Sequence, residues 1–329
     1  MVGVRDQRIL VTGGTGSIGS EIVRQLIKRS PKHITILSRD DSKQFYLKEE
    51  LSGHANVSFV IGDVRDRESL SRVFRNNIDI VIHAAALKHV EICELNPTES
   101  VKTNILGTQN IVDLSIENNV KKLISISTDK AVNPTNTMGA TKYLAEKITL
   151  DSNKHSSIIS FCVRFGNVLS SRGSVIPSMI KGLKNNGKIW ISDRDVTRFA
   201  IPIDVAASLV IDSLELSHGG EIFVLKMKSF SINQLVNVLM GLNLTDKEVE
   251  IEERGLTQGE KLHEDLVSFD ELQRLWESET HYVIMPYGST PKSNSIFSKS
   301  NMEIYNSGTE GMFSDEEIKT EITKYLNEF

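Results

Sequence analysis

The chain has 329 residues, of which 39% are hydrophobic and 25% are charged, enough for two modest domains or for one large α/β domain with an added lobe. Its formal net charge of −5 excludes the basic surface that nucleic-acid binding requires, so we expect no nucleic-acid partner. Two isolated cysteines, no apolar run of membrane-spanning length and no secretory leader predict a cytoplasmic protein with no zinc or other metal site and no membrane partner.

Short apolar runs alternate with amphipathic helical patterns along the first half of the chain. The runs are apolar on both faces, as strands buried in a parallel sheet are. Predicted strands cover 8–12, 33–37, 57–61, 79–85, 122–127 and 158–165. Predicted helices cover 20–29, 66–76, 98–119 and a segment that closes with 142–153. This alternation predicts an α/β fold with a doubly wound parallel sheet, Rossmann-like in type.

The rhythm changes after residue 166, where a loop rich in glycine and serine begins. Later elements are shorter: we expect helices near 175–186, 203–216, 231–241 and 314–328, and a strand at 188–191. We therefore predict a first domain of residues 1–166, joined by parts of 203–227. Residues 167–202 and 228–329 are predicted to form a smaller C-terminal lobe.

A glycine-rich loop, TGGTGSIGS at 12–20, follows the first strand and opens the first helix. Glycine permits a tight turn and lets the backbone approach a pyrophosphate, which then rests on the helix N-terminus. This placement makes residues 1–166 a predicted dinucleotide-binding domain. The residues expected to contact the cofactor here are Gly13, Thr15, Gly16, Ser17, Ile18 and Gly19.

The end of the second strand, ITILSRDD, indicates which dinucleotide is bound. Ser38 and Arg39 stand where NAD enzymes usually have an acidic residue, and a hydroxyl with a guanidinium suits the 2′-phosphate of NADP. Asp40 leaves NAD possible, because one residue of slippage would make it the acceptor for the ribose 2′-hydroxyl. NADP is the predicted cofactor.

Two further loops lie at the ends of predicted strands. GDVRD at 62–66 offers Asp63 to the adenine amine, with Val64 beside it, although an aspartate after glycine is also common in turns. HAAALKHV at 83–90 has small residues that let backbone lie against a cofactor; these are Ala84, Ala85 and Ala86. Lys88 and His89 would project over the carboxyl ends of the strands, where ligands bind in such sheets.

The stretch STDKAVNPTNTMGATK at 127–142 has the frame of an oxidoreductase motif, in which a proton-relay residue precedes a lysine by four positions. The relay position holds Met138, whose thioether neither gives nor takes a proton, and Lys142 lies one turn later on the same helix face. Lys142 is well placed to bond a nicotinamide ribose. Asp129 and Lys130 form an acid–base pair at the strand end, so we expect the chemistry there rather than an exposed ion pair of little worth.

Nine motifs follow one another in order between about residues 8 and 270. They are TGGTGSIG, SRDD, GDVRD, HAAALKHVE, NILGTQN, STDKAVNPTNTMGATK, RFGNVLSSRGSVIP, VTRF and GEKLHE. With these motifs the chain resembles the nucleotide-sugar 4,6-dehydratases that act on UDP-N-acetylglucosamine, polysaccharide biosynthesis proteins of the extended short-chain dehydrogenase/reductase superfamily.

The resemblance implies that C4 of the sugar is oxidised with NADP+, water is lost across C5 and C6, and hydride returns to C6. It implies Lys130 as the base for C5, Asp129 as the acid for C6 and Thr128 as the partner of the C4 oxygen. A lysine must be neutral to act as a base, and we expect burial to lower its pKa. The residues expected at the substrate are Lys88, His89, Ser127, Met138, Asn167, Val175, Arg198, Arg254 and Glu260, with Val168 at the cofactor.

The sequence departs from the family pattern in two places. Many relatives have tyrosine where Met138 stands, although one branch has methionine; Asp129, Lys142 or a water would then take the proton of the C4 hydroxyl. Thr257 and Gln258 replace the usual Arg-Pro before GEK, and Arg254 is a possible substitute for the lost phosphate contact.

Two other functions fit the same cofactor motif. A UDP-N-acetylglucosamine 4-epimerase needs this cofactor and pocket but no acid–base pair for C5 and C6. A non-catalytic NADP-binding protein would explain Met138 but not Asp129, Lys130 and Lys142 together. Whether C5 is inverted during elimination is left open. The resemblance also implies a homo-oligomer, either a dimer or a hexamer.

Overall fold

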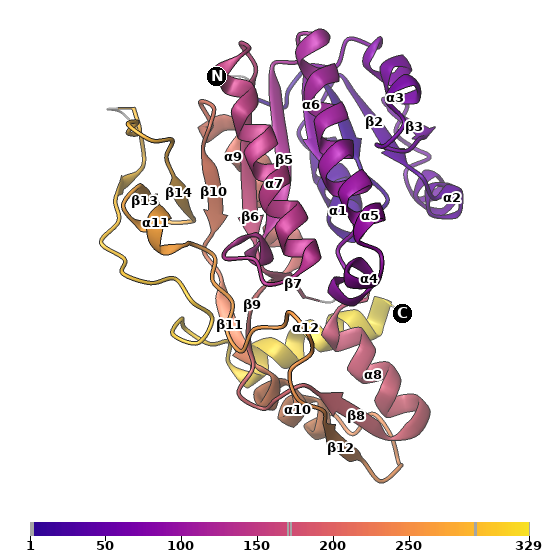
Figure 1. The fold of residues 1–329 in the computed structure, drawn as a ribbon. Helices are drawn as coiled ribbons and strands as arrows, with labels where there is room; N and C mark the ends of the chain where they lie inside the picture. Colours follow the sequence, from indigo (N-terminus) through magenta and orange to yellow (C-terminus); the bar gives the residue numbers. More distant parts are fainter. Residues whose placement is uncertain (1–2, 170, 172, 293–294, 329) are drawn as a thin grey trace.

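The computed structural model describes residues 3–169, 171, 173–292 and 295–328. Ser170 and Arg172 of the predicted glycine-rich loop lie outside these residues. The described chain forms an upper α/β part built on a large sheet and a smaller lobe below it (Figure 1).

The large sheet has ten strands in the described residues, in the order β15-β13-β14-β10-β6-β5-β4-β1-β2-β3. The strands from β3 across to β10 run parallel, whereas β14, β13 and β15 are antiparallel additions at one edge. The bounds are β1 Arg8–Thr12, β2 His33–Ser38, β3 Val57–Ile61, β4 Ile80–His83, β5 Lys122–Thr128, β6 Ile159–Phe165, β10 Ile222–Leu225, β13 Leu275–Glu277, β14 His281–Ile284 and β15 Ser298–Lys299. The predicted doubly wound sheet is confirmed.

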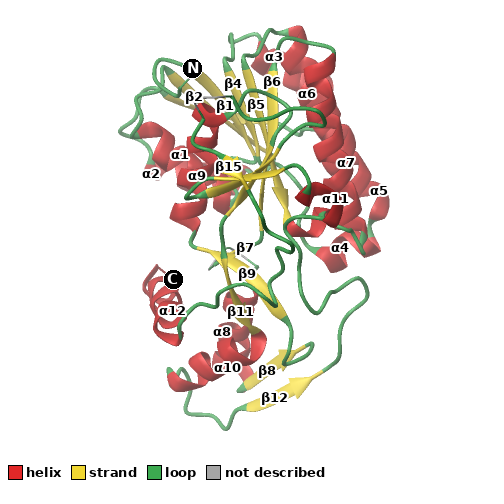
Figure 2. Ribbon diagram, turned by 90° about the vertical axis from the view of Figure 1, so that its left-hand side faces the viewer, coloured by secondary structure: helices red, strands yellow, loops and turns green. Residues whose placement is uncertain are grey.

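Helices cover both faces of this sheet. Figure 2 shows α1 and α9 on one side and α3, α6 and α7 on the other. The helices of this part are α1 Ser17–Ile27, α2 Asp41–Glu50, α3 Arg67–Phe74, α4 Val90–Leu95, α5 Pro97–Ser100, α6 Gly107–Glu117, α7 Thr137–Asp151, α9 Ile203–Leu216 and α11 Phe269–Leu272, with short 3-10 turns at Asp129–Ala131 and Ser152–Lys154.

The core of this part is divided by the sheet, because successive strand residues point to opposite faces. In β1, Ile9 and Val11 join the cluster that packs against α1 and α9, whereas Leu10 joins the cluster that packs against α3 and α6. Both faces of the strand are therefore buried, which is why its sequence is uniformly apolar.

The lobe has its own core between short strands and three helices. Ile180 of α8, Ile191 of β8 and Leu235 of α10 pack in one cluster with Ile318 of the C-terminal helix α12. The lobe elements are β7 Asn167–Val168, α8 Val175–Asn186, β8 Lys188–Ile191, β9 Thr197–Ile201, β11 Lys228–Ser231, α10 Ile232–Gly241, β12 Glu250–Glu253 and α12 Asp315–Glu328. They include a three-stranded sheet, β11-β9-β7, and a two-stranded sheet, β12-β8.

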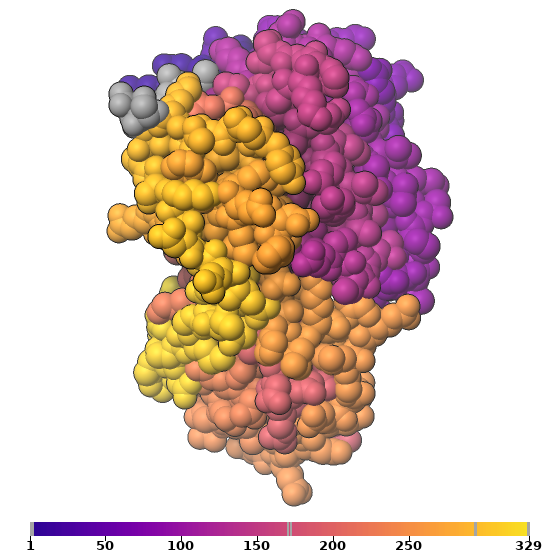
Figure 3. Space-filling model, turned by 60° about the vertical axis from the view of Figure 1, so that its left-hand side comes forward, coloured from indigo at the N-terminus to yellow at the C-terminus, as the bar shows by residue number. Residues whose placement is uncertain are grey.

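The middle of the expected lobe segment 228–329 differs from the structure, because α11 and three strands in it belong to the upper part. Strands β13, β14 and β15 belong to the large sheet, where β14 pairs with β10. Figure 3 shows this C-terminal third, orange to yellow, running along one side of the molecule from the upper part to the lobe.

The predicted helix 98–119 is also interrupted. The chain forms α5, a π-helical turn at Val101–Leu106 and then α6. The buried side chain of Asn104 in this turn accepts a hydrogen bond from Leu87 N at 2.8 Å, and its amide donates to Leu87 O at 3.1 Å and to Thr141 Oγ1 at 3.0 Å. These tertiary bonds fix the loop after β4. Single turns of π-helix are frequent at functional sites.

Candidate active site

The glycine-rich loop crosses from the end of β1 to the start of α1. Gly13 has φ +66°, and a Cβ there would lie 2.7 Å from Ala85 N and 2.8 Å from Ala84 O. The loop therefore packs directly on the backbone after β4, and only glycine fits. Gly16 is the N-cap of α1 and no side chain caps this helix end, which leaves it suited to bind a phosphate. The predicted dinucleotide loop fits this geometry.

His83 at the end of β4 locks this loop in place. Its Nδ1 lies 2.7 Å from Thr12 Oγ1, and its Nε2 lies 3.1 Å from Thr108 Oγ1 of α6. Burial, helped by the nearby Lys142 charge, lowers the pKa of His83 to about 3, so the ring is neutral at physiological pH. His83 is not among the predicted site residues, although a histidine at the end of an apolar strand was a visible signal.

The residues expected at the adenosine ribose have partners within the protein. Ser38 is buried, and its hydroxyl accepts a hydrogen bond from Gln44 Nε2 at 3.2 Å. Asp40 caps α2 by accepting from Lys43 N at 2.9 Å. Arg39 is half exposed, and its Nη1 lies 3.6 Å from Asp63 Oδ2.

Asp63 itself lies in a charged cluster. Its carboxylate receives Arg65 Nη2 at 2.7 Å, and although burial opposes the shift, Arg65 and Arg39 lower the pKa of Asp63. The adjacent Val64 is buried and packs against Gly107. A Cβ added to Gly107 would lie 2.7 Å from Val64 Cγ2. The carboxylate that was expected at adenine is thus held by arginines.

The loop after β4 carries Ala86, Lys88 and His89, all exposed. His89 lies against the loop that enters the lobe, because a Cβ on Gly173 would be 2.8 Å from His89 Cε1. Burial, and the charge of Lys88 beside it, lower the pKa of His89. Asn167 and Val168 form β7, the first strand of the lobe, and Val175 opens α8.

Asp129 and Lys130 form a compact acid–base group at the end of β5. Asp129 is fully buried, and its Oδ1 accepts from Thr128 Oγ1 at 2.6 Å and from Lys130 N at 2.8 Å. Lys130 Nζ lies 3.1 Å from Asp129 Oδ1 and 3.8 Å from Oε1 of Glu264. The three predicted catalytic residues of this segment are therefore joined by direct hydrogen bonds.

The expectation that burial lowers the pKa of Lys130 is wrong. Burial alone acts in that direction, but the carboxylates of Asp129 and Glu264 outweigh it and raise the pKa. Lys130 therefore carries a proton in the absence of substrate. Before Lys130 can act as a base, this proton has to leave its amine.

Met138 and Lys142 lie on the buried face of α7, as their spacing predicts. Lys142 Nζ donates to Ile126 O at 2.7 Å, and burial lowers the pKa of Lys142. Ser127 is buried, and its hydroxyl has no hydrogen-bond partner in the described structure. The next residue of α7, Tyr143, is 39% exposed, so it does not replace the missing relay.

Arg198 and Glu260 hold the loop that precedes Glu264. Arg198 Nη2 donates to Glu260 Oε1 at 2.8 Å, and Nη1 donates to Lys261 O at 3.0 Å. Arg254 lies elsewhere: its guanidinium donates to Glu252 at 2.8 Å and stacks 5.3 Å from the ring centre of Trp190. The structure thus joins Arg198 to Glu260 but ties Arg254 to the β8–β12 tip of the lobe.

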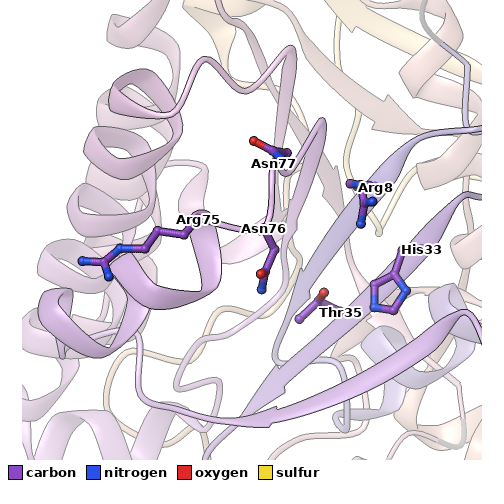
Figure 4. Close-up of a pocket in the computed structure, with 6 residues that line it drawn as sticks. All are labelled: Arg8, His33, Thr35, Arg75, Asn76 and Asn77. Carbon is purple, nitrogen blue, oxygen red and sulfur yellow. The ribbon is translucent and has the colours of Figure 1, made fainter.

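A cavity among the described residues lies away from this site. It measures about 360 Å³ and lies at the amino ends of β1 and β2, where Arg8, His33 and Thr35 meet Asn76 and Asn77 (Figure 4). The carboxyl ends of the same strands, where the glycine loop lies, are at the opposite edge of the sheet. In doubly wound folds ligands bind at the carboxyl edge.

Comparison with known proteins places the chain in a family. A family model described as polysaccharide biosynthesis protein matches residues 9–286. Over 324 residues the chain is 44% identical to an uncharacterized membrane protein of Methanocaldococcus jannaschii, with 96% of this chain and 95% of that protein covered. None of the helices in the described residues has the length and apolar composition needed to cross a bilayer.

Two other relatives have named activities. The chain is 42% identical over 285 residues to a UDP-N-acetylglucosamine 4,6-dehydratase (inverting) of Campylobacter jejuni, covering 85% of this chain and 83% of that protein. It is 38% identical over 287 residues to a UDP-glucose 4-epimerase of Rickettsia bellii, with the same coverage of 85% and 83%.

Solved structures share the fold over most of the chain. The X-ray structure of Pen from Bacillus thuringiensis superposes with a TM-score of 0.90 at 36% identity, covering 98% of both chains. DesIV, a dTDP-glucose 4,6-dehydratase of Streptomyces venezuelae solved with NAD and TYD bound, superposes with a TM-score of 0.71 at 21% identity, covering 78% of this chain and 86% of that one.

Proposed function

The chain belongs to the polysaccharide biosynthesis protein family, and within it we propose that this protein is a UDP-N-acetylglucosamine 4,6-dehydratase. The proposed product is a UDP-4-keto-6-deoxy-N-acetylhexosamine. The observation that carries the proposal is the hydrogen-bonded Thr128–Asp129–Lys130 group at the carboxyl end of β5, in which Asp129 is fully buried. A sugar placed over this edge would meet an acid and a base side by side.

A nicotinamide cofactor fits the residues of this chain. The backbone of the glycine loop and the uncapped N-terminus of α1 would bind the pyrophosphate. The buried Lys142 would donate a hydrogen bond to the nicotinamide ribose. The backbone of Ala84 and Ala85, which lies against Gly13, would also contact the cofactor, and we expect Val168 to do so as well. When bound, the cofactor supplies hydride transfer from C4 and its return to C6.

Side chains of the protein accept and donate the protons of the reaction. Thr128 Oγ1 would accept the proton of the C4 hydroxyl and pass its own to Asp129 along their 2.6 Å hydrogen bond. This path replaces the relay that Met138 cannot provide. The 4-ketone acidifies C5, Lys130 removes that proton, and Asp129 protonates the departing C6 oxygen.

The substrate would lie between the two parts of the molecule. From the upper part, the proposed substrate contacts are Lys88, His89, Ser127 and Met138. From the lobe, they are Asn167 and Val175. Arg198 and Glu260 would support the nucleotide end through the loop that they hold. Arg254 is a weaker candidate because Glu252 and Trp190 already engage it.

The second candidate is a 4-epimerase, which the Rickettsia relative favours by name. An epimerase has no use for a buried carboxylate and amine that act on C5 and C6. Incubation of the purified protein with UDP-N-acetylglucosamine, followed by mass spectrometry, distinguishes the two. We expect a product lighter by one water; a new stereoisomer of unchanged mass would establish the epimerase and refute the dehydratase.

For the cofactor we infer NADP. The carboxylate of Asp40 is occupied by the α2 cap and by Lys43, whereas the Arg39 guanidinium is half exposed at the loop. Replacing Arg39 with alanine should weaken NADP+ binding by roughly 10- to 100-fold, the worth of a charge-assisted hydrogen bond, and leave NAD+ binding nearly unchanged.

Calorimetric titration of wild type and Arg39→Ala with both nucleotides measures this difference. The matched control is Arg72→Ala, an exposed arginine on α3 that pairs with Glu68. Equal losses for NADP+ and NAD+ would contradict the assignment. Tighter binding of NAD+ than of NADP+ by the wild type would favour Asp40 as the ribose acceptor.

A further inference from the structure

Glu264 lies beside the proposed catalytic pair and has no role in the mechanism so far. Its side chain is 4% exposed, and its Oε1 is 3.8 Å from Lys130 Nζ. The second oxygen, Oε2, is buried without a hydrogen-bond partner in the described structure. A buried carboxylate oxygen without a hydrogen bond is costly, so the position of this carboxyl group beside Lys130 calls for a reason.

The backbone holds Glu264 firmly in this place. Its N–H donates to Ser307 Oγ at 2.9 Å, and its carbonyl accepts from Ser307 N at 2.9 Å. Ser307 Oγ in turn lies 2.8 Å from Thr197 Oγ1 of β9. The carboxyl group is thus fixed from the lobe side while it faces the end of β5.

Four charged groups face this carboxyl. Lys130 and Asp129 lie on the β5 side, and Arg198 of β9 and Lys261 lie on the lobe side, where Lys261 Nζ is 3.9 Å from Oε2. Burial and the Asp129 charge favour the protonated form, against the three cations, and the result is a raised pKa for Glu264. The carboxyl can therefore take up a proton more readily than an exposed glutamate does.

The proton count of the proposed reaction requires such a group. At rest Lys130 Nζ donates to Asp129 Oδ1 at 3.1 Å, as an ammonium group does in an ion pair with a carboxylate. Oxidation at C4 delivers one proton to Asp129 through Thr128, and Lys130 must then lose its own proton before it can attack C5. Asp129, now protonated, cannot accept it. A second acceptor within reach of Lys130 Nζ is needed.

We propose that Glu264 is this acceptor: it takes the proton from Lys130 before elimination and returns it afterwards. The assignment rests on the proposed dehydratase function. A gap of 3.8 Å is closed by a small approach of the two side chains or by one bridging water. Glu264 acts on the reaction only through the protonation of Lys130 and does not contact the sugar.

The cycle then balances. After C4 oxidation Asp129 and Glu264 are protonated and Lys130 is neutral. The C5–H bond breaks and its proton joins Lys130 Nζ, the electron pair forms the C5–C6 double bond, and the C6 oxygen leaves as water with the Asp129 proton. When C6 is reduced, C5 takes its proton from Lys130, and Glu264 returns the stored proton to the amine. Each group ends as it began.

The test replaces Glu264 with glutamine, which keeps the shape but cannot accept the proton. Two steps are followed separately in deuterium oxide with UDP-N-acetylglucosamine: appearance of the reduced cofactor, which reports C4 oxidation, and deuterium at C5, which reports the action of Lys130. In Glu264→Gln we expect C4 oxidation at the wild-type rate and C5 exchange slower by roughly 100-fold.

The pH profile adds a readout that a structural role would not move. Without Glu264 the Lys130 proton must go to solvent, so C5 exchange in Glu264→Gln should rise with pH, whereas the wild type stays nearly level over the same range. Glu264→Asp, which restores a carboxylate one carbon shorter, should recover part of the rate and the level profile.

The matched control is Asp265→Asn, at the next residue, whose carboxylate accepts from Asn306 Nδ2 at 2.7 Å instead of facing Lys130. An asparagine oxygen can accept the same hydrogen bond, so both steps should proceed at wild-type rates. Equal slowing of oxidation and exchange in Glu264→Gln, or no change in either, would overturn the proposal. A wild type that forms no dehydrated product would instead refute the proposed function.

Discussion

Replacing Lys130 with alanine should slow water loss by roughly 10²- to 10⁴-fold, the contribution of a positioned general base. Lys130 Nζ is held 3.1 Å from Asp129 Oδ1 at the end of β5, and the substitution removes the amine that we propose takes the C5 proton. Oxidation at C4 should persist, because Thr128 and Asp129 keep their 2.6 Å hydrogen bond. Single-turnover measurements of reduced cofactor and of dehydrated product separate the two steps.

Lys154→Ala is the control for this variant, since Lys154 pairs with Asp151 on the surface and its side chain is 72% exposed. It should show wild-type turnover. Unchanged water loss in Lys130→Ala would refute the assigned base. Retained cofactor binding by the variant shows that a lost rate does not come from a lost fold.

Replacing Arg164 with methionine should lower the free energy of unfolding by about 3–5 kcal/mol, the cost of leaving buried charges unpaired. Arg164 of β6 is 1% exposed and donates to Glu146 Oε2 of α7 at 2.7 Å, to Glu271 Oε2 of α11 at 2.9 Å and to Leu266 O at 2.9 Å. Because Arg164 is the register partner of Ser127, this network lies directly beside the carboxyl end of β5, where the proposed catalytic residues lie.

Urea unfolding of Arg164→Met against wild type measures the loss. In the variant, the two buried carboxylates have lost their cation, so each binds a proton more readily in the folded state than in the unfolded state. The loss in free energy of unfolding should therefore shrink as the pH falls. Arg72→Met, which breaks an exposed pair with Glu68, should change stability by less than about 0.5 kcal/mol. A similarly small effect for Arg164→Met would show that the network contributes little.

The parallel strands and several helices were predictable from local pattern. The run at 8–12 matches β1 because this strand is buried on both faces of the sheet. The run at 57–61 matches β3, an only partly buried edge strand, because Val57, Phe59 and Val60 favour the extended conformation. Helices at 175–186 and 203–216 match α8 and α9 to the residue, since Gly187 ends one in the left-handed conformation and Pro202 opens the other.

The elements that sequence reasoning missed depend on tertiary partners. Strands β13 and β14 are short and are defined by their pairing at the sheet edge, with Trp276 opposite Val283. The π-turn around Asn104 exists because its side chain binds Leu87 and Thr141. No periodicity within the segment carries that information.

In the candidate site too, some features were predictable from local sequence and others depend on tertiary partners. The pairing of Asp129 with Lys130 followed from their adjacency at a strand end. The raised pKa of Lys130 did not, because Glu264, from a distant segment of the chain, supplies the second carboxylate. The motif GEKLHE contained Glu264, but only the fold shows that its carboxyl faces the end of β5.

The most direct measurement is the position of solvent deuterium in the product formed by the wild-type protein from UDP-N-acetylglucosamine in deuterium oxide. Proton removal and return by Lys130 predicts a dehydrated product that carries one deuterium at C5, and the configuration there then distinguishes inversion from retention. A product without deuterium at C5, or one that keeps its C6 hydroxyl, would contradict elimination by the Asp129–Lys130 pair.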